Sequence, residues 1–145
     1  PVCKEMKPYL MTAVDDSSDS KLVKALSGNK SIAVLGTYNK SSAAAESAHS
    51  IVPITEAGSG NNSPVGLYGA ACSIVQLERV ESSTMLYHKC DTYKGGSGGP
   101  VVFKDSSGVV RVIGIHRGSS ANSLGKSSNE AVLFTQKFIS SYLKN

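Results

Sequence analysis

The segment from Gly95 to Pro100 carries the most specific chemical signal in the sequence. It reads Gly-Gly-Ser-Gly-Gly-Pro and leads into the apolar run Val101 to Phe103. Glycine adopts backbone conformations closed to other residues, so such a loop can direct consecutive N–H groups at one point. Acyl transfer needs donors of this kind at the developing oxyanion, with a nucleophilic hydroxyl beside them. Ser97 supplies that hydroxyl, and a flexible Gly/Ser turn without chemistry is the alternative.

Two further polar residues flank this loop along the chain. Thr92 lies five residues before Ser97, and His116 ends the apolar run Val112 to Ile115. A histidine at the end of a strand is by itself more often a structural residue than a functional one. The combination with Thr92 and Ser97 reverses that preference.

Together these motifs resemble the chymotrypsin-like serine proteases, whose nucleophile stands in G-x-S-G-G-P. The Gly114 to Gly118 segment, which reads G-I-H-R-G, looks like the G-[IV]-H-x-G strand of the glutamyl endopeptidases and the viral 3C-like proteases. In that branch the histidine lines the S1 pocket and bonds a P1 Glu or Gln side chain, assisted by a threonine. The resemblance therefore assigns the pocket to His116 and Thr92. Gly96 stands where trypsin-like digestive enzymes carry an Asp, which agrees with this branch.

The resemblance also implies the remaining roles. Ser97 would be the nucleophile, and the N–H groups of Gly95 and Ser97 would form the oxyanion hole. The backbone from Arg117 to Ser119 would pair with an extended peptide or protein substrate. The expected function is a serine endopeptidase that hydrolyses peptide bonds after Glu or Gln through an acyl-enzyme at Ser97, with no cofactor and no metal.

The base and the acid of a catalytic triad are harder to place. The segment around His49 weakly resembles the T-A-A-H-C motif of the family's catalytic histidine. His49 lies only 48 residues before Ser97, however, which is much less than the family's usual spacing. Ser31 occupies the position of the family's Asp, in Ser-Ile-Ala-Val-Leu. His88 is expected on a strand, and Lys94 on an exposed loop. We therefore expect the catalytic His to precede Pro1, on a segment or separate chain that completes a first barrel.

A non-catalytic alternative follows from the same observations. A protease-like β-barrel without a full triad would bind peptides or a partner protein through the S1 groove. Ser31 at the Asp position is the feature that motivates it.

The elements that must position these residues are mostly short strands. A helix is expected from 21 to 26, capped by Ser20 and stopped by Gly28, and an amphipathic helix from 135 to 143 that buries Phe138, Ile139, Tyr142 and Leu143. Strands are expected at 32–35, 51–54, 65–71, 73–77, 84–88, 101–103, 109–116 and 131–134, with a hairpin turn at 104–108. Regular short strands predict an all-β sandwich or barrel.

The resemblance implies a chymotrypsin-like antiparallel β-barrel with a C-terminal α-helix over residues 31–145. Residues 1–30 would be an N-terminal arm or the remnant of a first barrel, with a solvated polar turn at Asp15, Asp16 and Asp19.

Composition limits the function classes. The chain has 145 residues, of which 40% are hydrophobic and 18% charged, so it is an ordinary soluble globular sequence and not a disordered or fibrous one. No apolar run approaches the roughly 20 residues of a membrane-spanning helix. The net charge of +4 is scattered, so nucleic acid is an unlikely partner. Cellular location stays open.

The three cysteines, Cys3, Cys72 and Cys90, fit neither a disulfide scaffold nor a C-x-x-C motif. Cys72 and Cys90 could meet across neighbouring strands. Buried free thiols are nevertheless the favoured prediction.

Overall fold

The computed structural model describes residues 10–17, 20–28, 31–39, 51–54, 65–92, 96–121 and 127–143. In chain order the strands are β1 (Leu10–Met11), β2 (Ile32–Asn39), β3 (Ile51–Ile54), β4 (Val65–Cys72), β5 (Ile74–Val80), β6 (Ser83–His88), β7 (Pro100–Lys104), β8 (Val110–Ala121) and β9 (Ser127–Leu133). The helical elements are α1 (Lys21–Leu26), α3 (Gln136–Phe138) and the π-helical turn η2 (Ile139–Leu143). The predicted strands and α1 are therefore present, with ends that differ by a few residues.

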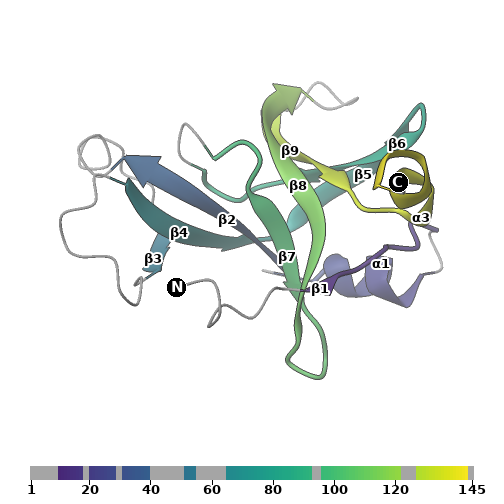
Figure 1. Ribbon diagram of the computed structural model, residues 1–145, viewed down its shortest axis with the longest axis horizontal. Helices are drawn as coiled ribbons and strands as arrows, with labels where there is room; N and C mark the ends of the chain where they lie inside the picture. The colour runs from purple at the N-terminus through teal and green to yellow at the C-terminus, as the bar shows by residue number, and fades with distance from the viewer. Residues whose placement is uncertain are drawn as a thin grey trace.

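The strands form one mainly antiparallel sheet. Its order is β3-β4-β2-β7-β8-β9-β6-β5, and β1 adds to β8 in parallel (Figure 1). The long strand β8 and its neighbour β9 run through the middle of the molecule, with β2 and β4 to one side and β5, β6 and the helices to the other. The hydrogen-bonded path is open in the part of the chain that is described. The all-β prediction is confirmed, whereas the chymotrypsin-like barrel is not confirmed.

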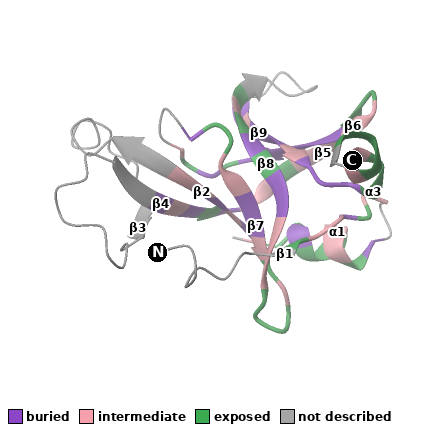
Figure 2. Cartoon of the chain, viewed as in Figure 1, coloured by how far each residue is buried: buried purple, intermediate pink, exposed green. Residues whose placement is uncertain are grey.

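The strands of the sheet supply most of the hydrophobic core. Fully buried side chains come from β2, β4, β6, β7, β8 and β9, and the purple stretches of Figure 2 follow them. Val14 and Leu26 belong to the same cluster. The segment before residue 31 thus shares one hydrophobic core with the strands that follow it.

The predicted N-cap of the first helix is confirmed, and the last helix has a cap of the same kind. Ser20 Oγ accepts a hydrogen bond from the N–H of Val23, three residues on, as an N-cap should. Thr135 Oγ1 accepts from the N–H of Phe138 in the same way at the start of α3. In the part of the chain that is described, no helix is long and apolar enough to cross a membrane.

The predicted apolar face of the last helix is wrong at Tyr142, which is 59% exposed. The chain widens into the π-helical turn after Phe138, so the spacing of an α-helix no longer applies. The ring of Tyr142 packs on Phe138 with centroids 5.0 Å apart, and Phe138 stacks on Phe134 at 5.8 Å.

The cysteine prediction is also wrong for two of the three residues, because Cys72 and Cys90 form a disulfide with Cα atoms 4.8 Å apart. The cause is strand register. Ile74, the first residue of β5, is opposite His88, the last residue of β6. Because the pairing is antiparallel, the residue two before Ile74, which is Cys72, comes to lie opposite the residue two after His88, which is Cys90. Cys3 lies outside the described residues.

Candidate catalytic site

Ser97 stands at the corner of a tight turn. The N–H of Gly99 donates to the carbonyl of Gly96 at 3.0 Å, and Gly98 has a φ of +87°. A β-turn with positive φ at its third residue strongly favours glycine there. The side chain of Ser97, on the second residue, is exposed.

The turn is fixed to two strands by backbone contacts. The N–H of Gly98 donates to the His116 carbonyl, and the N–H of His116 donates to the Gly99 carbonyl, both at 2.8 Å. A Cβ on Gly99 would lie 2.1 Å from the carbonyl oxygen of Leu35 in β2, so any larger residue is excluded without a backbone shift. Ser97 Oγ donates to the carbonyl of Arg117 at 2.9 Å.

One edge of β8 beside this turn is unpaired among the described residues. The ladder between β7 and β8 ends at the pair Pro100 and Ile115, whereas the ladder between β8 and β9 continues from Gly118 to Ala121. Within the described residues, no strand pairs with the other edge of that last stretch. An extended peptide could add to it as a further strand.

His116 is buried and contacts a second buried histidine. The Nε2 of His88 lies 3.3 Å from the Nδ1 of His116, and the rings meet edge to face. The N–H of Cys90 donates to His88 Nδ1 at 3.2 Å, so that nitrogen carries no proton. Neutral His88 therefore donates from Nε2 to His116 Nδ1, and the proton of neutral His116 resides on Nε2.

Burial keeps both imidazoles neutral. Burial and the neighbouring His116 lower the pKa of His88 to about 4. Burial also lowers the pKa of His116, against the opposing effects of a backbone hydrogen bond at Glu130 and the Glu130 carboxylate. The Glu130 carboxylate lies 3.5 Å from the exposed guanidinium of Arg117.

The structure brings together two of the four predicted site residues, Ser97 and His116. Thr92 is half-buried in the segment after β6, and among the described residues it makes no hydrogen bond with either of them. Gly95, like His49 and Lys94, lies outside the described residues. No sequence motif predicts the contact of His88 with His116, because these residues meet only through the pairing of β6, β9 and β8.

Ser31 does not stand where a catalytic acid would be needed. Antiparallel pairing places Ile32 opposite Phe103, whereas Leu35 approaches Gly99 at the other end of β7. At about 3.4 Å per residue, Ser31 is roughly 15 Å along the ladder from the Ser97 turn. Its hydroxyl donates instead to the Leu26 carbonyl, where α1 ends.

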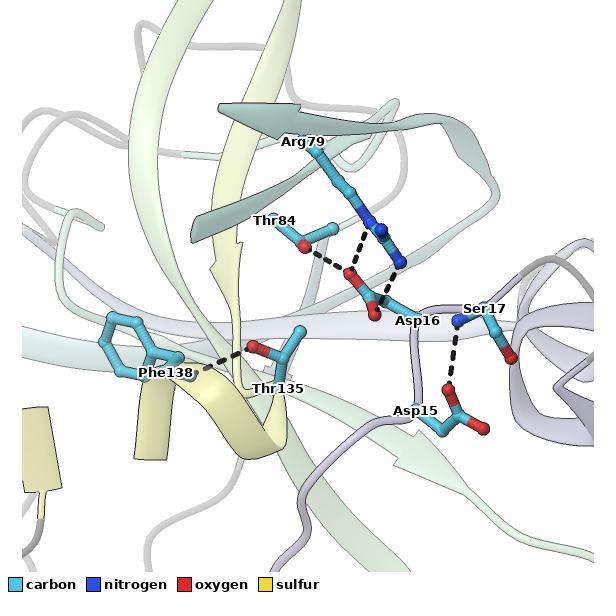
Figure 3. Close-up of polar contacts among 7 residues, drawn as sticks. All are labelled: Asp15, Asp16, Ser17, Arg79, Thr84, Thr135 and Phe138. Carbon is cyan, nitrogen blue, oxygen red and sulfur yellow. Dashed lines mark hydrogen bonds and ion pairs between the residues drawn. The ribbon is translucent and has the colours of Figure 1, made fainter. Parts of the chain in front are cut away.

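A second polar region surrounds Asp16, beside the β5–β6 hairpin (Figure 3). Asp16 accepts hydrogen bonds from Thr84 at 2.5 Å and from the guanidinium of Arg79 at 3.1 and 3.2 Å. These bonds lower the pKa of Asp16, with Thr84 as the largest cause. The predicted solvated turn is thus wrong at Asp16, which joins the N-terminal segment to β5 and β6. A hollow of about 490 Å³ adjoins this network and reaches α3.

Comparisons of the chain with protein-family models, curated proteins and solved structures found no match.

Proposed function

We propose that this chain carries the nucleophile and the specificity pocket of a serine endopeptidase that cleaves after Glu or Gln. The observation that carries the proposal is the position of Ser97. It is exposed at the corner of a turn that β8 holds by backbone hydrogen bonds, next to the open edge of that strand and to the buried His116.

The strand order supports a more specific proposal for the fold, a chymotrypsin-like barrel. Only Ser73 separates β4 from β5. When these two are counted as one bent strand, the order β2, β4–β5, β6, β9, β8, β7 and back to β2 forms a ring in which every neighbouring pair is hydrogen-bonded.

In the proposed mechanism a substrate strand pairs with the open edge of β8, which brings its scissile carbonyl to Ser97. Ser97 Oγ forms a bond to the carbonyl carbon while its proton passes to a base, and that proton then leaves with the amine as the C–N bond breaks. Water hydrolyses the resulting ester. The N–H groups of Ser97 and Gly95 stabilise the oxyanion. The base comes from outside the described residues, and Ser97 exchanges its bond to Arg117 for one to that base.

The histidine pair supplies the selectivity in this proposal. With His88 bonded to Nδ1, the ring of His116 offers Nε2–H as its donor. A carboxylate or amide oxygen of the P1 residue would accept from it. An apolar P1 side chain offers no such oxygen, so it would displace the backbone contact of the His116 ring at Glu130 without replacing it.

One observation favours a second function, a peptide-binding module. Ser97 bonds to the carbonyl of Arg117, which cannot take its proton. The same open edge of β8 would then bind a peptide without cleaving it. Ser31 no longer supports this alternative, since it lies far from the Ser97 turn.

A serine-directed fluorophosphonate probe tests the two functions. If the enzyme proposal is correct, Ser97 Oγ displaces fluoride from the probe and one label is found at Ser97, while Ser97→Ala removes it. A peptide ending in Glu should bind both proteins, since its binding needs no nucleophile. Peptide binding without labelling shows that this chain by itself acts as the module, and folded protein that neither labels nor binds the peptide overturns both.

A further inference from the structure

We propose that the reduced form of this chain binds a zinc ion through Cys72, His88 and Cys90. The two sulfur atoms and the Nδ1 of His88 all lie within 4.8 Å of one another, and all three side chains are buried. The site contacts His116 through His88, but its metal binding does not rest on catalysis at Ser97.

Zinc suits this set of donors. Structural zinc sites in proteins are built from cysteine thiolates and imidazole nitrogens. Bonds of about 2.3 Å to sulfur and 2.0 Å to nitrogen hold such ligands roughly 3.5 Å apart on a tetrahedral ion. The distance from Cys72 Sγ to His88 Nδ1 is already 3.9 Å. The sulfur of Cys90 has to move away from that of Cys72, which reduction allows, and a water or another donor takes the fourth position.

The protonation state of His88 also fits a metal ligand. Its Nδ1 carries no proton, because it accepts from the N–H of Cys90. A metal on that nitrogen replaces this weak contact and leaves Nε2–H directed at His116. Imidazole ligands usually make such a bond through their second nitrogen, which fixes the orientation of the ring.

The change of state balances in atoms and charge. A thiol or phosphine reductant supplies two electrons, and with two protons the disulfide becomes two thiols. A zinc dication then displaces both thiol protons and is held by two thiolates and a neutral imidazole. The centre carries no net charge, which limits the cost of burying it.

Cobalt binding tests the site in the reduced, desalted full chain, kept free of oxygen and carrying Cys3→Ser so that only this pair of thiols remains. We expect one Co²⁺ per chain, with tetrahedral visible bands and an intense thiolate-to-cobalt absorption, and displacement by Zn²⁺. The oxidised chain should show neither signal. If reduction loosens the fold, Zn²⁺ should restore it, because binding is then coupled to folding.

X-ray absorption of the zinc-loaded chain identifies the ligands without a variant. Two sulfur neighbours at about 2.3 Å and nitrogen at about 2.0 Å are expected. His88→Asn keeps an acceptor for the N–H of Cys90 but is a poor zinc ligand, and it should weaken binding by more than the roughly 10- to 100-fold that loss of an outer-shell partner costs. A reduced chain that takes up no cobalt, or cobalt bound without the thiolate absorption, shows that the pair is a structural disulfide only and overturns the proposal.

Discussion

The Ser97 turn and the Asp16 network are both polar, yet they are held together in opposite ways. Backbone hydrogen bonds from β8 and the close approach of Leu35 in β2 fix the Ser97 turn. Side-chain contacts from Thr84 and Arg79 build the Asp16 network, and backbone pairing holds only the neighbouring Val14. The first region therefore depends on glycine geometry, and the second depends on charge.

The difference shows where binding capacity remains. Both oxygens of the Asp16 carboxylate accept hydrogen bonds from neighbouring side chains. Asp16 therefore has little remaining capacity to bind a ligand in the adjoining hollow. The Ser97 turn leaves a hydroxyl exposed and lies beside an unpaired strand edge among the described residues. The hollow still has polar groups in its lining, among them Glu81, Gln136 and Lys137, but it lacks the combination of an exposed nucleophile and an unpaired strand edge that the described part of the Ser97 region offers.

Substitution of Gly99 should have the largest effect. Gly99→Ala places a methyl group against the Leu35 carbonyl, and the backbone shift should cost about 3 kcal/mol in the free energy of unfolding and displace Ser97. Gly98→Ala is the matched control, since its Cβ meets open space and only the positive φ costs about 1–2 kcal/mol. Chemical denaturation measures both, and equal losses would show that the approach to β2 is not tight.

Replacement of His116 should change peptide selectivity more than stability. We expect His116→Ala to weaken binding of a peptide ending in Glu by roughly 10-fold or more, because the buried donor is lost. Binding of the same peptide ending in Leu should change little. Thr92→Val should weaken only the Glu peptide, by less, if Thr92 belongs to the pocket. Calorimetric titration gives the affinities, and an unchanged ratio for His116→Ala contradicts the pocket assignment.

The sequence predicts local features well and long-range ones poorly. A capping serine and a following glycine are sufficient to locate α1, and the Gly-rich run identifies the Ser97 turn. The disulfide depends on the register of β5 against β6, which no short motif encodes. The contact of His88 with His116 depends on three strands aligned across the sheet. Ser31 matches a short motif but lies at the end of β7 remote from the Ser97 turn, because such a motif does not encode which strands are neighbours.

Substitution of Asp16 should cost stability without affecting the Ser97 turn. Asp16→Asn weakens the bonds to Thr84 and Arg79, and the loss should be about 1 kcal/mol, mostly from Thr84, because the Arg79 side chain is 70% exposed. Asp15→Asn is the control, since Asp15 accepts only from the N–H of Ser17 among the described residues. Fluorophosphonate labelling of Ser97 should be equal in both variants. A change in labelling would mean that the two regions are coupled.

Acidification gives the smallest effect and the sharpest test of the charge-held region. The hydrogen bond from Thr84 is the largest cause that holds the pKa of Asp16 below its ordinary value of 3.8. The folded chain thus binds this proton less tightly than the unfolded chain. The stabilisation is complete above pH 3.8 and is lost as the pH falls through the lowered pKa of Asp16 in the folded chain.

The pKa of Asp105 is lowered as well, chiefly by its bond to Arg111, so the pH dependence of the wild type alone does not separate the contribution of Asp16 from that of Asp105. The difference in unfolding free energy between wild type and Asp16→Asn, measured in urea at a series of pH values, removes the Asp105 contribution. That difference should shrink below pH 3.8. A constant difference would mean that Asp16 stabilises the chain through packing, and the contrast with the Ser97 turn would no longer be one of charge.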